Sequence, residues 1–159
     1  LIYVAIIGMV VTSFMFFSIS VSNSRNKTYV VQEVQANARV ALEIISQKIR
    51  EADGINTGPS TFDSDPGTLS LSVVDTSKDP TVIDLDQDDG ILQIQEKNDD
   101  PVSVTSNEVK VTNLVFTNLT PASEQGNIRV EITVEYNNVD NSVGYNYSQS
   151  LTTAISLRR

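Results

Sequence analysis

The chain opens with an uninterrupted apolar run, which limits its fold more than any other feature. Residues 1–24 read LIYVAIIGMVVTSFMFFSISVSNS and carry no charge; the first charged side chain is Arg25. Because a helix rises about 1.5 Å per residue, this run would extend about 36 Å, enough to cross the roughly 30 Å hydrocarbon core of a bilayer. We call residues 1–24 the apolar segment and expect it to be embedded in a membrane or in a hydrophobic polymer.

Two other kinds of apolar helix have to be distinguished from this one. A cleavable signal peptide has an apolar region of about 7–15 residues, and the apolar segment is longer than that. A buried helix of a soluble domain needs a large surrounding core, yet the chain has five Phe, five Tyr and no Trp. Both alternatives therefore fit the sequence less well than an embedded helix.

The helical pattern continues past the apolar segment, through residues 25–53, which we call the neck. The only glycine before Gly54 is Gly8, and no proline precedes Pro59, so strong helix-ending residues are absent for some fifty positions. In the neck, apolar residues recur every three or four positions, which indicates one face of a helix packed against the rest of the chain. The residues expected on this face are Val31, Val34, Ala38, Leu42 (or Ala41), Ile45, Ile49 and Ala52.

The sequence also indicates where this helix ends. Asp53-Gly54 is typical of a helix terminus, with Gly54 free to adopt the left-handed conformation that closes a helix. The prediction is one helix of about 80 Å, apolar on all sides in its first half and on one side in its second.

A different pattern begins after Gly54. Residues 56–67 are rich in Gly, Pro, Ser, Asn and Asp, which predicts a loop. Short alternating runs then predict strands at 68–74, 81–85, 90–96, 102–105, 108–116, 127–137 and 145–155. The last two predict a long antiparallel hairpin whose apolar face the neck can cover. The expected fold class is α+β, a long N-terminal helix packed on a C-terminal antiparallel β-sheet domain at residues 54–159.

Charge is divided between these parts. The neck has five Lys/Arg and four Asp/Glu, a net of +1, whereas residues 54–159 have six Lys/Arg and sixteen Asp/Glu, a net of −10. Binding to nucleic acid through phosphates requires clustered Lys and Arg, so we expect no nucleic-acid partner. An acidic surface favours solubility outside the cell.

The residue types that most chemistry requires are missing. The chain has no His and no Cys, which removes the usual general base, the Ser-His-Asp triad, thiolate metal sites and disulfides. Its glycines form neither GxGxxG nor GxxxxGK. We therefore expect no catalytic site and no cofactor.

Two weaker patterns remain. Residues 84–90 (DLDQDDG) place carboxylates at alternating positions, as in calcium loops, but the glycine falls one position late and Gln95 stands where the bidentate glutamate belongs. We interpret them as an acidic turn between two strands, with no metal bound. Asn26 and Asn118 fit the N-x-[ST] glycosylation sequon, as does Asn146 in a predicted strand; in a chain this rich in Asn, Ser and Thr such matches also arise by chance.

Two stretches carry a family resemblance. LIYVAIIGMVVTSF resembles the helix of type IV pilins and pseudopilins just after their cleavage and methylation site, and QANARVALEIISQKIREADG resembles the helix continuation of minor pilins. The resemblance covers about a third of the chain well and the rest by architecture alone. In the family, an assembly glutamate precedes the motif matched by YVAIIG; aligning on that motif, we expect about six residues before Leu1, so no residue here takes the glutamate's role.

The resemblance implies a structural subunit of a type IV pilus-like or pseudopilus filament. The residues it places in the filament core are Leu1, Tyr3, Val4, Ile7, Gly8, Val10, Val11, Phe14, Phe17 and Val21. Its implied partners are copies of itself in a helical homopolymer, the inner membrane before assembly, and the pilus assembly machinery; the filament would lie outside the cell. A minor or tip pilin that initiates the filament or binds a ligand, and a monomeric membrane-anchored extracellular β domain, are the alternatives.

Overall fold

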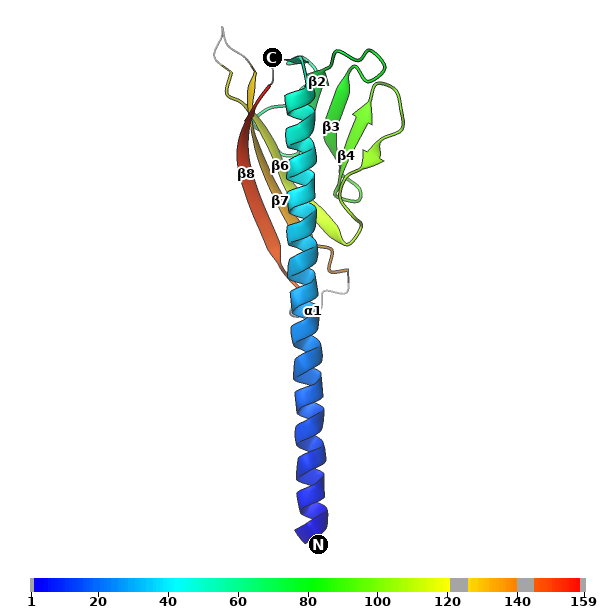
Figure 1. Ribbon diagram of the computed structural model, residues 1–159, viewed down its shortest axis with the longest axis vertical. Coiled ribbons are helices and arrows are strands. Elements are labelled where there is room, and N and C mark those ends of the chain that lie inside the picture. The colour runs from blue at the N-terminus through cyan, green and yellow to red at the C-terminus, as the bar shows by residue number, and fades with distance from the viewer. Residues whose placement is uncertain (1, 121–125, 140–144, 158–159) are drawn as a thin grey trace.

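One long helix organises the molecule. The computed structural model describes residues 2–120, 126–139 and 145–157, and its helix α1 (Ile2–Glu51) is unbroken over 50 residues, or about 75 Å. Eight strands follow in the described residues: β1 (Gly54–Ile55), β2 (Leu69–Ser72), β3 (Thr81–Asp86), β4 (Ile91–Glu96), β5 (Val102–Ser103), β6 (Val109–Asn118), β7 (Asn127–Tyr136) and β8 (Ser148–Ser156). They gather beside the C-terminal half of α1, and the N-terminal half projects alone (Figure 1). The α+β fold expected from the sequence is confirmed.

The strands form two sheets rather than one continuous sheet. Their orders are β1-β2-β3-β4-β5 and β6-β7-β8, and all neighbours within each sheet are antiparallel. The sheets are separate because loop and turn residues occupy the outer edge of β6. The Gly67 and Asp63 amides donate to the carbonyls of Leu114 and Phe116, at 2.7 and 2.9 Å. The second sheet lies against α1, which contacts β6, β7 and β8.

The apolar face of the neck packs into the core, at a position slightly different from the expected one. Val34, Ala38, Ile45 and Ile49 have no exposed surface and join the core cluster. Leu42 is half-buried against that cluster, and Ala41, the alternative at this point, is fully buried. The buried stripe of the helix and the turn after it is Val30, Val34, Ala38, Ala41, Ile45, Ile49 and Ala52.

The expected position of Val31 in this stripe is wrong by one residue. Val31 is only half-buried, whereas Val30 is 1% exposed. The observed stripe repeats every 4, 4 and 3 residues, an 11-residue period of about 3.7 residues per turn that stays on one side of a straight helix. Val31 lies three residues before Val34 rather than four, so it falls on the flank of the stripe.

The helix ends differently from the prediction. It stops at Glu51, where the Ala52 amide still donates to the Lys48 carbonyl at 3.1 Å. Gly54 does not take the left-handed conformation; it belongs to β1 and pairs with Ser72. Because the Asp53 amide donates to the Ser72 carbonyl at 2.8 Å, strand pairing rather than a glycine cap ends the helix.

The β7–β8 hairpin has the predicted alternation. Ile128, Val130, Ile132 and Val134 of β7 have no exposed surface, and the intervening side chains are exposed or half-buried. β8 begins at Ser148, later than expected, so the sequon residue Asn146 precedes the strand. The hairpin places its apolar face under the neck, and this contact holds the projecting helix to the β domain.

Candidate functional site

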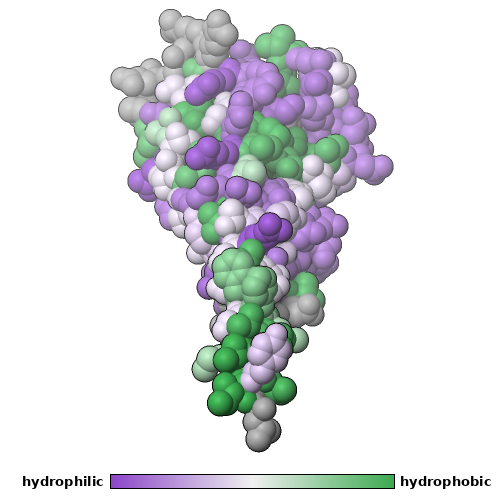
Figure 2. Space-filling view, turned by 60° about the horizontal axis from the view of Figure 1, so that its bottom comes forward, coloured by the Kyte–Doolittle hydropathy of each residue, from purple (hydrophilic) through white to green (hydrophobic). Residues whose placement is uncertain are grey.

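The most unusual surface of the molecule is the apolar segment. Nothing in the described residues covers it: all its described residues are exposed, with exposed fractions of 79% at Ile2, 70% at Phe16 and 58% at Ile19. Figure 2 brings this end toward the reader and shows the projecting helix covered by hydrophobic side chains. A soluble monomer rarely exposes a contiguous apolar patch of more than a few hundred Å², so this surface requires a partner, lipid or protein.

The residues that the resemblance places in a filament core lie all around this helix. Each of them from Tyr3 onward is exposed, and Leu1 lies outside the described residues. By length and composition α1 can cross a membrane, and it is the one described helix that can. A long apolar helix near an N-terminus indicates membrane association or a signal sequence.

Two hydroxyls of the apolar segment are satisfied within the helix. The Thr12 hydroxyl donates to the Gly8 carbonyl at 2.7 Å, and the Ser13 hydroxyl to the Met9 carbonyl at 2.9 Å. Such bonds satisfy hydroxyls inside the helix, as a hydrocarbon environment requires. Ser18 and Ser20 make no side-chain hydrogen bond to the described residues, so both remain free to bond to a neighbouring helix.

Gly8 leaves an open place on this surface. A β-carbon built on Gly8 would have no neighbouring atom within 4 Å, so nothing in the described residues requires a glycine there. Small residues in apolar helices allow a second helix to approach closely. Gly8 therefore fits a contact made outside this chain.

Tyrosines fix the point where the helix leaves the β domain. The Asn26 amide donates to the Tyr145 hydroxyl at 2.6 Å, and the Gln35 amide to the Tyr147 hydroxyl at 3.1 Å. The rings of Tyr145 and Tyr136 lie 6.4 Å apart. Burial, followed by the nearby Glu108 carboxylate, raises the pKa of Tyr136, which keeps this hydroxyl neutral.

The sequence analysis did not identify these tyrosine contacts. Three of the five tyrosines fall within residues 136–147, at the end of the predicted hairpin where the runs 127–137 and 145–155 are joined. That clustering was the available signal. It could not show that Asn26, considered only as a sequon, would be hydrogen-bonded to one of them.

A second polar contact ties the middle of the neck to the segment before β6. The Asn37 side-chain oxygen accepts from the Ser106 amide at 2.9 Å, and its nitrogen donates to Glu33 at 2.9 Å. The Ser106 hydroxyl also donates to Glu33, at 3.3 Å. These part-buried bonds fix the rotation of the neck about its axis, which the apolar stripe alone fixes less sharply.

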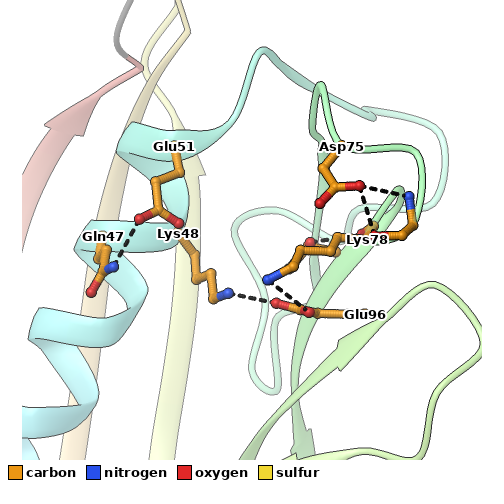
Figure 3. A network of polar contacts seen from close by, with 8 residues as sticks. Gln47, Lys48, Glu51, Asp75, Lys78 and Glu96 are labelled. Atoms are coloured by element: carbon orange, nitrogen blue, oxygen red, sulfur yellow. Dashed lines mark hydrogen bonds and ion pairs between the residues drawn. The ribbon is translucent and has the colours of Figure 1, made fainter.

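An ion-pair network ties the end of the neck to the first sheet. Lys48 of α1 lies 2.6 Å from Glu96 of β4, and Lys78 lies 3.4 Å from the other oxygen of Glu96 (Figure 3). The hydrogen bond from Lys48, more than any other contact, lowers the pKa of Glu96. With the tyrosine and Ser106 contacts, this network holds the neck to the β domain at three levels, and α1 continues from the neck into the apolar segment without a break.

The weaker sequence signals lie away from the apolar segment. Residues 84–86 are the end of β3 and residues 87–90 are the turn to β4; Asp86 accepts from the Asp88 amide at 3.0 Å and Gly90 has a φ of 68°. The described residues contain no group of three or more His, Cys, Asp or Glu that could hold a metal ion. Asn118 is exposed at the end of β6 and accepts from the Thr120 amide at 3.0 Å.

No family model, curated protein or solved structure matches the chain.

Proposed function

We propose that the chain is a structural subunit of a filament of the type IV pilus or pseudopilus kind, which polymerises by burying the apolar segment among copies of itself. One observation carries this proposal: an apolar helix that is exposed on all sides continues without a break into the helix on which the β domain is packed. Before assembly the apolar segment lies in a membrane, and the acidic β domain lies in water outside it.

The physical basis of assembly is an exchange of neighbours. Lipid tails are as apolar as leucine, so the apolar segment is equally well removed from water in the membrane and in the polymer. Close packing and hydrogen bonds between helices are what make the polymer more stable than the membrane-bound monomer. Gly8 provides a point of close approach, and Ser18 and Ser20 provide hydroxyls without a partner among the described residues. The net charge of −10 on residues 54–159 keeps the outside of such a polymer soluble.

The continuity of α1 supports a polymer over a monomer that is only anchored. An anchor works equally well through a flexible linker, whereas this helix is held at three levels by the contacts described above. In a polymer, that rigidity transmits the packing of the apolar segments into a fixed arrangement of the β domains. A monomer that is only anchored in a membrane does not require a rigid connection between its helix and its β domain.

The test is polymerisation of the purified chain on removal of detergent. The full chain is expected to form regular filaments visible by electron microscopy and pelletable by centrifugation. Val10→Lys is expected to abolish them, since a lysine at the middle of an apolar helix costs about 2.5–3.5 kcal/mol in each copy. Val74→Lys is the matched control, because Val74 is 79% exposed on the β domain and Val10 is 55% exposed.

The outcomes separate the alternatives. Filaments from the full chain and Val74→Lys, but not from Val10→Lys, support the proposal. Incorporation into lipid vesicles as a monomer, with no filaments under any condition, would favour the membrane-anchored β domain. Filaments that still form after deletion of residues 1–24 would contradict assembly through the apolar segment.

A further inference from the structure

Four of the five positive charges of the neck have no partner among the described residues. Among the described residues there are two ion pairs, and both are made by Glu96. Arg25, Lys27, Arg39 and Arg50 have no side-chain hydrogen bond or ion pair to any described residue. The neck thus keeps unpaired cations beside a β domain with a net charge of −10.

A groove between α1 and the β4–β5 segment has an excess of acidic side chains; the Lys48–Glu96 ion pair is part of its lining. It has a volume of about 360 Å³. Its apolar lining comes from both sides: Ile44, Ile94, Val102 and Val104. Val102 is 67% exposed there, although it is a large apolar side chain. Asp99 and Asp100 also line the groove; both are exposed, and neither carboxylate has a partner among the described residues.

One face of α1, where the apolar segment meets the neck, carries side chains complementary to the groove. Val21, Arg25 and Tyr29 are spaced by four residues, so they lie on one side of α1, and all three are exposed. Val21 and Tyr29 are apolar neighbours for the groove lining, and the aliphatic stem of Arg25 can lie along apolar surface while its guanidinium meets a carboxylate. Lys27 is two residues further on, about 200° around the helix, between the polar side chains of Asn23 and Ser24.

We propose that Arg25 of one copy docks at the groove between α1 and β4–β5 of a neighbouring copy, where its guanidinium pairs with Asp99 and Asp100. This inference rests on the proposed filament, and it names a contact between copies outside the apolar core. The occupant is a second copy because this chain itself carries the complementary cation and apolar neighbours, and because that cation has no partner among the residues that the structure describes.

The contact also defines a displacement between the two copies. Ile44, which lines the groove, is nineteen residues after Arg25, or about 28 Å along α1. Within one copy the two sites are therefore too far apart to meet. Two parallel copies displaced by about that distance along the helix axis bring them level. Other copies, at different displacements along the axis, surround the apolar segment. The Arg25 contact fixes the displacement between one pair of neighbouring copies.

The test uses the absence of cysteine from the chain. Filaments are prepared from the full chain with Arg25→Cys and Asp100→Cys together and treated with a short bifunctional thiol reagent. A direct disulfide requires α-carbons within about 7 Å, which is closer than two long ion-paired side chains hold them. A ladder of covalent oligomers is expected on a denaturing gel, since each copy has one site of each kind. Each single variant yields dimers at most.

The matched control moves only the cation site. Lys27→Cys with Asp100→Cys changes the same number of charges in the same turns of α1, but on the other face, and is expected to give no ladder. A ladder of equal strength from this control would overturn the inference. Filaments of the Arg25→Cys, Asp100→Cys chain that give no ladder would also overturn it, while leaving the proposed function intact. No filaments from the unaltered chain would contradict the proposed function instead.

A charge exchange tests the same contact without cross-linking. Arg25→Glu alone, and Asp99→Lys with Asp100→Lys, are each expected to raise the concentration needed for polymerisation by up to about fivefold, the upper end of the effect of losing one exposed ion pair. Combining the three changes restores opposite charges across the contact and is expected to recover most of that loss. Combining the two lysine changes with Lys27→Glu is expected not to. Recovery with both combinations would show that net charge alone matters and would refute the contact.

Discussion

Ile45 provides a quantitative test of how the neck is held to the β domain. Its side chain has no exposed surface and lies in the middle of the buried stripe. Truncation of a buried isoleucine to alanine costs about 2–5 kcal/mol, and the cost is higher where the surroundings cannot close the cavity. Because α1 is pinned on both sides of Ile45 by hydrogen bonds and an ion pair, we expect Ile45→Ala to cost about 3–5 kcal/mol.

The assay is thermal unfolding of the full chain in detergent, followed by the near-ultraviolet circular dichroism of the tyrosines. For a chain of this size, each kcal/mol lowers the melting temperature by about 2–4 °C, so a fall of roughly 6–20 °C is expected. Val40→Ala is the matched control: Val40 is on the same helix but 45% exposed, and surface changes stay within about 0.5 kcal/mol. Equal shifts for the two variants would refute the assigned packing face.

Three further predictions concern the β domain. Lowering the pH below 4.5, the ordinary pKa of a glutamate, should remove stability, because the folded protein lowers the pKa of Glu96 and the stabilisation is lost as the carboxylate protonates; Glu96→Gln should reduce this loss in acid titrations of melting temperature. Gly67→Ala should destabilise by about 1–3 kcal/mol, since the new carbon would lie 3.0 Å from Phe116, whereas Gly58→Ala, with no atom within 4 Å, should not; equal denaturant midpoints would contradict this. Millimolar calcium should leave the melting temperature unchanged, and a rise would indicate that the acidic turn containing Asp86 binds the ion.

Periodicity in the sequence was sufficient to predict the main architecture. An exposed or buried position in a regular helix or strand repeats at a fixed interval, so the buried stripe of the neck and the alternation of β7 were both readable from side-chain type. The error at Val31 shows the limit of this reasoning. Val30 and Val31 are chemically identical, and only the phase of the stripe against the β7–β8 sheet decides which is buried.

Features that depend on pairing between distant residues were not predictable in this way. Gly54 is the residue type typical of a helix cap, but its pairing with Ser72, eighteen residues away, makes it part of a strand. The division into two sheets depends on loop residues such as Gly67 bonding to the edge of β6. The groove beside α1 likewise combines Ile44 with residues about fifty positions later, and no local pattern relates them.

The central claim is that the apolar segments of neighbouring copies pack against one another. Its most direct test is a nitroxide spin label attached through Val10→Cys in the full chain, with electron paramagnetic resonance spectra recorded in detergent and after detergent removal. Helices packed about 8–10 Å apart leave little room for a side-chain label between them. The label at position 10 should therefore be mobile in detergent and strongly immobilised in the assembled sample, and it should stay immobilised when labelled chain is diluted with unlabelled chain. Assembled particles in which the label at position 10 remains mobile, or a label already immobilised in the detergent monomer, would contradict the account.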